Sequence, residues 1–306
     1  MGNLFKSIEP IDTSTPVDIT SNIDQITQDT MVKLILGAPL GDPDLFNRWF
    51  SISVKVIQNL DPNYGSLNAT YIERYEEMMN FVRSTPVGKT LGRSKNKDLF
   101  QKEAMFFTMW LAAGGTVAGQ RASLRFLTDL SASDRKLIQD EADGFHRCIK
   151  RGHKFNKCFV RTKYIDQFVM EVLRLETPVA NVRGRAIKDF VLTSLNGRYQ
   201  IKKGDWLIGN VLSAQRDPEF FKNHSSFDMH RSQQNTKENF FAFGGPYNQK
   251  PTSTNHKCIG QRLAISFMKM FILHFTQCDA KLGPLVQSPS KTSRVQINAS
   301  KFSCRL

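Results

Sequence analysis

The chain has 306 residues, 40% of them hydrophobic, which is enough to bury one large core or two modest ones. No apolar run reaches membrane-spanning length and the N-terminal MGNLFKSIEP lacks a signal-peptide pattern, so we do not expect an integral membrane or secreted protein. The 42 Lys and Arg against 28 Asp and Glu give a net charge of +14, which favours anionic partners, although no basic block is dense enough for a nucleic-acid-binding tail.

The first two-thirds of the chain show helical patterns after an irregular start over residues 1–20. The longest apolar helix is predicted over about residues 102–127 and contains Gly114-Gly115, and a basic loop, RCIKRGHKFNKC, comes later. The other helices in this part are predicted over residues 24–36, 43–59, 71–83 and 133–146.

The last third mixes helix and strand. A short helix over 166–176 ends at Thr177-Pro178, because the residue before proline avoids helical geometry. Short strands follow over 179–211, a helix runs over 258–275, and one hairpin is expected after Pro284. The predicted fold class is mainly α with a small β region, and no linker divides the chain.

Five cysteines, an odd number, are scattered through a chain that is not small. This predicts a reducing compartment rather than a disulfide framework, and therefore a protein that is cytoplasmic or peripheral to an intracellular membrane. The cysteines are Cys148, Cys158, Cys258, Cys278 and Cys304.

Cys258 is the first candidate for chemistry, because it opens an amphipathic helix. Helix N-termini and nearby cations stabilise a thiolate, which is a nucleophile or a metal ligand, and Lys257 and Arg262 are close in sequence. The alternative is a plain buried cysteine, the commoner case. The predicted buried face of this helix is Ile259, Leu263, Phe267, Phe271 and Phe275.

Gly260 strengthens the reading of Cys258 as a ligand. A glycine in the first helical turn costs about 1 kcal/mol relative to alanine, and it is useful where a large flat group approaches the backbone. With the upstream Phe241-Ala242-Phe243-Gly244, this pattern suggests a haem plane against the start of the helix.

Two further patterns are ambiguous when taken alone. Glu171 and Arg174 share a helix face, usually as an exposed ion pair, but apolar neighbours indicate burial with Arg231 as a third member. The Gly114-Gly115 pair indicates either close helix packing, the commoner case, or room for a ligand.

Together these motifs resemble the cytochrome P-450 superfamily, with the C-terminal two-thirds of its fold forming a single partial domain over residues 1–306. The resemblance implies a haem b cofactor with Cys258 as the axial thiolate to iron, and a structural triad of Glu171, Arg174 and Arg231. It implies cofactor contacts from Phe241, Gly244, His256, Lys257 and Gly260, within a ligand loop over 241–260.

The insert before the cysteine narrows the resemblance. Ordinary members have a short loop there, whereas GPYNQKPTSTNHKC is similar to the allene oxide synthase, hydroperoxide lyase and epoxyalcohol synthase group. His256 falls where that group contacts a haem propionate. The stretch Ala113-Gly114-Gly115-Thr116 lacks the acid with which oxygen-activating members deliver protons.

The resemblance implies an enzyme that rearranges fatty acid hydroperoxides to an allene oxide, an aldehyde or an epoxyalcohol, in oxylipin metabolism. Such an enzyme needs neither O2 nor a reductase, does not bind nucleic acid, and contacts a membrane surface peripherally. The substrate side would be formed by residues of the long helix: Leu111, Gly114, Gly115, Thr116, Val117 and Gln120.

The chain also departs from the group. Leu111 and Val117 stand where the plant enzymes have Asn and Lys, and Thr116 and Gln120 are the candidates to replace them. The chain is shorter than family members at its N-terminus, which suggests truncation. Two alternatives follow, an ordinary O2- and NADPH-dependent mono-oxygenase and a non-catalytic remnant.

A remote alternative is a zinc or nucleic-acid-binding module in the basic loop. Its ligands would be His146, Cys148, His153 and Cys158, residue types that suit zinc. Their spacing matches no established zinc-finger pattern.

Overall fold

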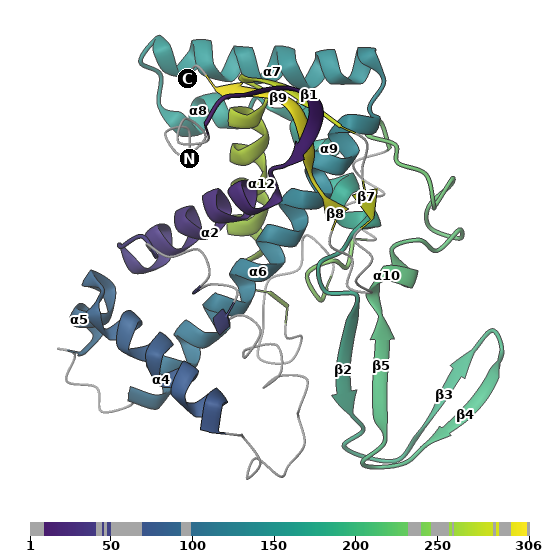
Figure 1. Cartoon of the computed structure of the whole chain (residues 1–306). Helices are drawn as coiled ribbons and strands as arrows, with labels where there is room; N and C mark the ends of the chain where they lie inside the picture. Colours follow the sequence, from purple (N-terminus) through teal and green to yellow (C-terminus); the bar gives the residue numbers. More distant parts are fainter. Residues whose placement is uncertain are drawn as a thin grey trace. The chain divides into compact units, whose positions relative to one another are not determined.

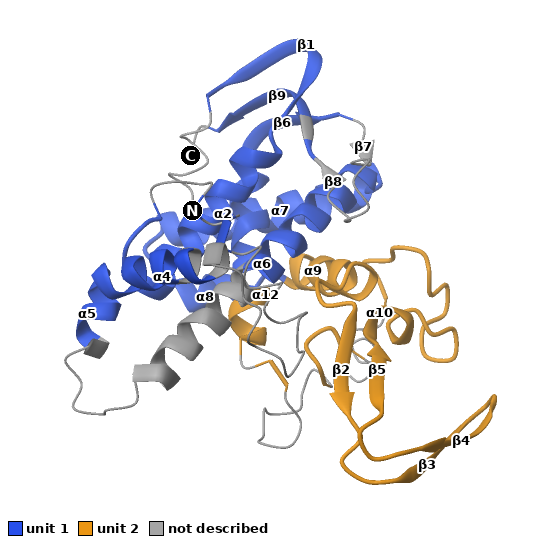
Figure 2. Cartoon of the chain, turned by 60° about the horizontal axis from the view of Figure 1, so that its bottom comes forward, with its two compact units in different colours: residues 1–162, 266–306 blue, residues 163–265 orange. Residues whose placement is uncertain are grey.

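The computed structural model describes residues 9–40, 45, 48–49, 69–92, 99–231, 240–245, 257–258, 260–283, 286–287 and 295–304 (Figure 1). The chain divides into two compact units (Figure 2). Unit 1 contains Met1–Thr162 and Ser266–Leu306, unit 2 contains Lys163–Ile265, and each is described by itself. Helices dominate and strands are short, so the predicted fold class is confirmed.

Unit 1 is built mainly from helices. The helix predicted over 102–127 is part of α6, and residues 24–36, 71–83 and 133–146 lie within α2, α4 and α7. The helix predicted over 43–59 falls almost entirely outside the described residues. The helices are α2 (Thr20–Leu36), α4 (Ala69–Ser84), α5 (Pro86–Gly92), α6 (Leu99–Asp129), α7 (Ala132–Lys150), α8 (Phe155–Phe159) and the larger part of α12 (Gln261–Phe275).

The helix ends follow ordinary capping chemistry. Ser131 precedes α7, and its hydroxyl accepts a hydrogen bond from Asp134 N at 3.1 Å. Gly37 ends α2 in the left-handed conformation with φ of 76°, which only glycine adopts without strain. Its N–H donates to Lys33 O at 2.9 Å, so an otherwise unpaired carbonyl of the last turn is satisfied.

A small antiparallel sheet joins the two ends of the chain. β9 (Asn298–Cys304) lies between β1 (Ile11–Asp18) and β6 (Cys278–Leu282). The prediction of an irregular start is therefore wrong for β1. Its sequence, IDTSTPVD, is exposed along most of its length and has no apolar alternation, so only its pairing with the distant β9 makes it a strand. The hairpin expected after Pro284 is β7 (Val286–Gln287) with β8 (Val295–Gln296).

α2 lies beside α6 (Figure 1), and polar side chains join the two helices. The Asp24 carboxylate accepts two hydrogen bonds from the Arg121 guanidinium, with Nε at 2.6 Å from Oδ1. One turn further along α2, Thr27 is hydrogen-bonded to the side-chain oxygen of Gln120. Near the other end of α2 an apolar cluster includes Met31, Leu36, Trp49, Met79 and, from α12, Phe267.

Unit 2 begins with α9 (Lys163–Leu175) and continues as two separate antiparallel pairs of strands. β2 (Asn181–Arg185) pairs with β5 (Trp206–Asn210), and β3 (Phe190–Ser194) pairs with β4 (Gly197–Ile201). Gly197 and Gly204, at the turns of this region, have φ of 131° and 95°, which glycine adopts without strain. α10 (Val211–Ala214) follows, and the first turn of α12 also belongs to this unit.

Four of the five cysteines are paired, so the expectation of a chain without disulfides is wrong. Cys148 is bonded to Cys158 between α7 and α8, and Cys278 to Cys304 between β6 and β9. Their Cα atoms are 5.7 Å and 4.2 Å apart, and the second pair sits in register on neighbouring strands. The first disulfide also uses two of the four ligands of the zinc alternative. No cluster of three or more metal-binding side chains occurs in the part of the chain that the structure describes.

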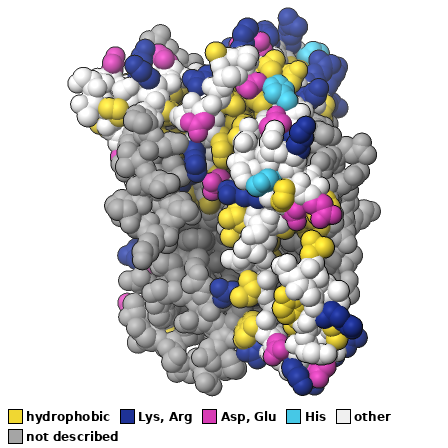
Figure 3. Space-filling model, turned by 90° about the vertical axis from the view of Figure 1, so that its right-hand side faces the viewer, with side chains coloured by type: hydrophobic (Ala, Val, Ile, Leu, Met, Phe, Trp, Pro, Cys, Tyr) yellow, Lys and Arg dark blue, Asp and Glu magenta, His cyan; other side chains and the backbone are white. Residues whose placement is uncertain are grey.

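The basic excess is not gathered in one place on the face seen in Figure 3. Lys and Arg side chains stand there in several separate positions with Asp and Glu among them. None of the helices in the described ranges has the length and apolar content needed to traverse a bilayer.

Candidate functional site

Glu171 and Arg174 form a buried ion pair on α9. Their side chains are 2% and 0% exposed, so this is not the surface pair that the spacing alone would suggest. The guanidinium binds the carboxylate with two parallel hydrogen bonds, Nε to Oε2 and Nη2 to Oε1, each 2.8 Å long. This two-point geometry is available to arginine and not to lysine.

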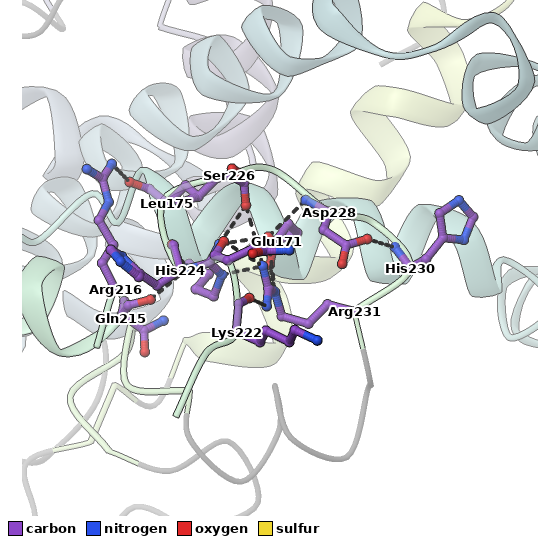
Figure 4. Close-up of polar contacts among 12 residues, drawn as sticks. Glu171, Leu175, Gln215, Arg216, Lys222, His224, Ser226, Asp228, His230 and Arg231 are labelled. Carbon is purple, nitrogen blue, oxygen red and sulfur yellow. Dashed lines mark hydrogen bonds and ion pairs between the residues drawn. The ribbon is translucent and has the colours of Figure 1, made fainter. Parts of the chain in front are cut away.

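Arg174 also holds the chain that follows α10. Nη1 donates to Gln215 O at 2.8 Å and His224 O at 2.6 Å, and Nη2 donates to Ser226 O at 3.1 Å. All three carbonyls belong to the irregular segment that follows α10, and they accept from Arg174 beside the Glu171 carboxylate, which Figure 4 shows among these residues. α9 therefore acts as a rigid anchor for the segment from 215 to 231.

Arg231 joins the pair, as the sequence predicted. Its Nε lies 3.3 Å from both oxygens of Glu171, and Asp228 N donates to Oε1 at 3.0 Å. The other nitrogens of Arg231 donate to the carbonyls of Lys222 and Asn223. Glu171, Arg174 and Arg231 thus form one hydrogen-bonded group inside unit 2.

Two residues of this group were not predicted. Phe221 is fully buried, and the guanidinium carbons of Arg174 and Arg231 lie 5.1 Å and 6.0 Å from its ring centre. Gln215 is also fully buried; its Oε1 accepts from Phe241 N at 2.8 Å, while its carbonyl accepts from Arg174. Both lie in the stretch QRDPEFF, residues 215–221, and nothing in that sequence indicates these contacts.

Gln215 therefore connects the triad to the loop of Cys258. In that loop Gly244 N donates to Phe241 O at 2.9 Å, and Gly244 has φ of 79°, a conformation suited to glycine. Cys258 N donates to Phe243 O at 3.0 Å, which brings the cysteine back beside the Phe241–Gly244 turn. Phe241 is 40% exposed, whereas its neighbour Phe240 is fully buried.

Cys258 lies just before α12 rather than inside it. The helix begins at Gln261, and Ala264 N donates to Gly260 O at 2.9 Å, so Gly260 occupies the N-cap position. Glycine is well tolerated there, so the energetic cost that the sequence suggested does not arise. A Cβ at Gly260 would lie 3.7 Å from Cys258 Sγ, so glycine leaves that side of the sulfur uncovered.

The buried face of α12 differs from the predicted one. Phe267, Phe271 and Phe275 are buried, but Leu263 is 43% exposed and Ile259 lies outside the described residues. The buried apolar residues of α12 begin six residues after the predicted Ile259, and they are Ile265, Phe267, Met268, Phe271, Ile272, Leu273 and Phe275. The first turn of α12, next to Cys258, is therefore open on its Leu263 side.

Lys257 is buried, and its pKa is lowered first by burial and then by the charge of Arg262. Cys258, between these two residues in sequence, is the free cysteine, since the other four are paired. His256 was predicted to contact the cofactor and lies outside the described residues.

The predicted substrate-side residues all lie on α6 of unit 1. Gly114 and Gly115 are half-buried, Thr116 and Val117 are buried, and the side chain of Leu111 lies outside the described set. Gln120 is fully buried and hydrogen-bonded to Thr27 of α2. Cys258 and the residues around it belong to unit 2, whereas the predicted substrate-side residues belong to unit 1.

Comparison with known proteins gives a family and a fold that this chain resembles. A family model described as Cytochrome P450 matches residues 149–300, about half of the chain. The solved haem domain of a mutant cytochrome P450DA superposes with a TM-score of 0.70 at 16% identity, covering 99% of this chain and 68% of that one. At this identity the likeness supports the fold alone.

Among curated relatives, the chain is 25% identical over 217 residues to a chloroplastic fatty acid hydroperoxide lyase from Solanum lycopersicum, covering 66% of this chain and 44% of the relative. It is 32% identical over 156 residues to a chloroplastic allene oxide synthase from Linum usitatissimum, covering 50% and 28%. It is 27% identical over 144 residues to a divinyl ether synthase from Solanum tuberosum, covering 45% and 30%. The chain spans less than half the length of these relatives.

Proposed function

Because this chain belongs to the cytochrome P450 family, we propose that it acts as a haem-thiolate enzyme that rearranges fatty acid hydroperoxides without O2 or a reductase. The observation that carries the proposal is the free Cys258 at the start of α12, preceded by the long insert. Curated relatives named hydroperoxide lyase, allene oxide synthase and divinyl ether synthase support the choice of substrate.

The residues around Cys258 suit a haem iron. Four cysteines are held in disulfides, which leaves Cys258 as the free soft donor of the kind that haem iron accepts from P450 proteins. Gly260 leaves space beside the sulfur, and Lys257 and Arg262 supply positive charge near an anionic ligand. When bound, haem b would supply the cleavage of the O–O bond of the hydroperoxide.

The protein's own part is to hold the thiolate in place. The Cys258 backbone is fixed by the hydrogen bond to Phe243 O, and the Phe241–Gly244 turn is fixed by Gln215. Gln215 is in turn held by Arg174 and Glu171. A sulfur on such a support keeps its position while the substrate changes, which is the preorganisation that catalysis needs.

The long helix favours hydroperoxide over dioxygen as the oxidant. Ala113-Gly114-Gly115-Thr116 carries no carboxylic acid to deliver protons to bound oxygen, whereas a hydroperoxide brings its own O–O bond. The side chains of Leu111 and Val117 cannot form a hydrogen bond with a peroxide. The proposal therefore includes three possible products, an allene oxide, an aldehyde and an epoxyalcohol.

The test uses the purified 306-residue chain loaded with haem. Incubation with a conjugated fatty acid hydroperoxide under argon, without NADPH, should consume the hydroperoxide and yield one of the three products by mass spectrometry. Cys258→Ser should lose both turnover and the thiolate-type absorption of the reduced, carbon monoxide-bound protein. Lys136→Ala, an exposed site on α7, is the matched control and should retain both.

Three outcomes contradict the proposal in different ways. Product formation only with NADPH and a reductase would identify a mono-oxygenase. Haem binding through Cys258 without any turnover would identify a non-catalytic remnant. Bound zinc without haem absorption would favour the zinc-binding module over a haem enzyme.

A further inference from the structure

The end of α7, the turn after it and α8 carry a dense group of exposed cations, here called the α7–α8 surface. Between Asp143 and Asp166 the sequence contains no acidic residue. In the described ranges of the chain no salt bridge joins these cations to an acidic side chain, although Arg147 helps to lower the pKa of Asp143 one turn before it. The exposed cations of the surface are Arg147, Lys150, Arg151, Lys154, Lys157 and Arg161.

Apolar side chains stand exposed among these cations. Ile149 is 37% exposed, Phe155 49% and Val160 74%. Exposed apolar side chains do not improve the hydration of a basic surface. A nucleic acid would also gain little from contact with an isolated valine. Cations interspersed with exposed aliphatic and aromatic side chains are typical of surfaces that rest on anionic lipid.

The surface is preformed rather than assembled on binding. α7 ends at Lys150, and Gly152, two residues further on, has φ of 76°. The last carbonyls of the helix accept from Gly152 N and His153 N, the arrangement of a Schellman cap. The disulfide between Cys148 and Cys158 ties α8 to the end of α7. Cations and apolar groups held on one scaffold lose little conformational entropy when a partner arrives.

Aromatic packing fixes α8 against α7. The ring of Phe155 meets Phe145 edge-on at 5.7 Å and stacks on Phe159 at 5.1 Å, so one side is anchored while the rest stays exposed. Lys269 of α12 lies 4.1 Å from the centre of the Phe159 ring, on the buried side.

We propose that the α7–α8 surface docks this protein on an anionic lipid bilayer. The cations pair with headgroup phosphates, while Phe155 and Val160 enter the boundary between headgroups and acyl chains. The inference stands on the surface itself and does not depend on haem chemistry. If the proposed function also holds, the same contact places the enzyme where fatty acid hydroperoxides dissolve.

The test measures binding of the 306-residue chain to vesicles of phosphatidylcholine with and without phosphatidylglycerol, by flotation. We expect binding only to the anionic vesicles, and less binding at high salt. The triple variant Lys150→Gln, Lys154→Gln, Lys157→Gln should bind about 100-fold more weakly, since each cation near an anionic surface contributes about fivefold. Circular dichroism and the mass of the disulfide-linked peptides establish that the variant is folded.

A matched control removes the same charge elsewhere. Arg198, Lys202 and Lys203 are exposed on and beside the β3–β4 hairpin, and the triple change to Gln should alter vesicle binding by less than about threefold. Val160→Ser should weaken binding about fivefold and Val160→Trp should strengthen it, because tryptophan favours the membrane interface.

Two results would overturn the proposal. One is an equal loss of vesicle binding in the control and in the α7–α8 variant, which would reflect net charge alone. The other is absence of vesicle binding while the chain binds DNA or polyglutamate through the same lysines, which would identify a soluble polyanion or an acidic protein as the partner.

Discussion

Glu171 illustrates how a buried charge is made tolerable. A carboxylate in the interior has to replace the water that it loses, and its two oxygens offer about four acceptor positions. Those positions receive two hydrogen bonds from Arg174, one from Asp228 N and a longer contact with Arg231. Removing any charged member would leave the others without compensation, so the group is expected to behave as a unit.

Glu171→Gln and Arg174→Lys are therefore expected to lower the free energy of unfolding by about 3 kcal/mol each. Gln removes the charge that both arginines face, and Lys keeps a charge but cannot form the two-point contact. Urea denaturation followed by circular dichroism measures the change. Lys136→Ala breaks an exposed pair with Asp140 and should cost less than about 0.5 kcal/mol. Equal effects at the two sites would contradict the buried-charge argument.

The sequence predicted this triad only in part. The spacing of Glu171 and Arg174 on an apolar helix indicated a buried pair, and that part of the geometry follows from helical periodicity. The carbonyls of His224 and Ser226 complete the group, but backbone acceptors have no side-chain signature in a sequence. Gln215 was missed for a similar reason, because its contacts are with backbone groups far along the chain.

Among the elements, the packing of α12 against α7 brings two histidines together. The rings of His146 and His274 lie 5.4 Å apart, and His146 Nε2 is 3.0 Å from Leu273 O. Burial, followed by the charge of His146, lowers the pKa of His274 from its ordinary 6.5 to about 4. The neutral form of His274 is therefore part of the folded state.

This lowered pKa predicts a loss of stability on acidification. Between pH 6.5 and about 4 the unfolded chain binds a proton at His274 that the folded chain does not, so stability falls as pH falls through this window. The total loss from this group should be about 3 kcal/mol. Urea titrations at several pH values should show a flatter profile for His274→Leu, whereas His153→Leu, at an exposed site, should follow the wild type. Parallel profiles for all three proteins would refute the role of His274.

The disulfides give a second test at this scale. Alkylation of the denatured, unreduced chain should label Cys258 alone, and all five cysteines after reduction. Cys304→Ser should lower the free energy of unfolding by about 3 kcal/mol, because the bond to Cys278 restricts the unfolded chain. Peptide mass mapping settles the pairing, and labelling of every cysteine without reduction would contradict it.

Helical periodicity predicted most helices, whereas strand pairing between distant segments was harder to foresee. α9 follows from an apolar repeat within its own sequence, and α6 from a long, mostly apolar stretch without proline. β1 depends on β9 at the other end of the chain, and the short α8 depends on the disulfide and on the rings of Phe145 and Phe159. Local sequence carries little information about such partners.

At the scale of the whole molecule, each boundary between the two units along the chain falls at the start of a helix or inside one. The boundaries fall at Lys163, where α9 begins, and at Ser266, in the middle of α12. This explains why the sequence shows no linker: composition does not change where a helix continues from one unit into the next.

A proline in the middle of α12 should therefore affect both units at once. Ser266→Pro removes one helical hydrogen bond and clashes with the preceding turn, which costs about 3 kcal/mol or more. We expect a lower thermal midpoint together with weaker haem binding at Cys258. Ala132→Pro, at the first position of α7, should leave both nearly unchanged. A normal haem spectrum in a destabilised Ser266→Pro variant would mean that α12 does not transmit the effect.

The hydrogen bond from Cys258 N to Phe243 O has an evolutionary consequence. The chain leaves the turn at Phe243 and returns to the same place at Cys258, so residues 244–257 begin and end beside each other. Closing a longer excursion of this kind adds only about 0.6 kcal/mol for each doubling of its length. Insertions and deletions there can therefore be sampled by natural selection while the sulfur stays where it is. A lineage could in this way lengthen one segment of the chain with the backbone position of Cys258 unchanged.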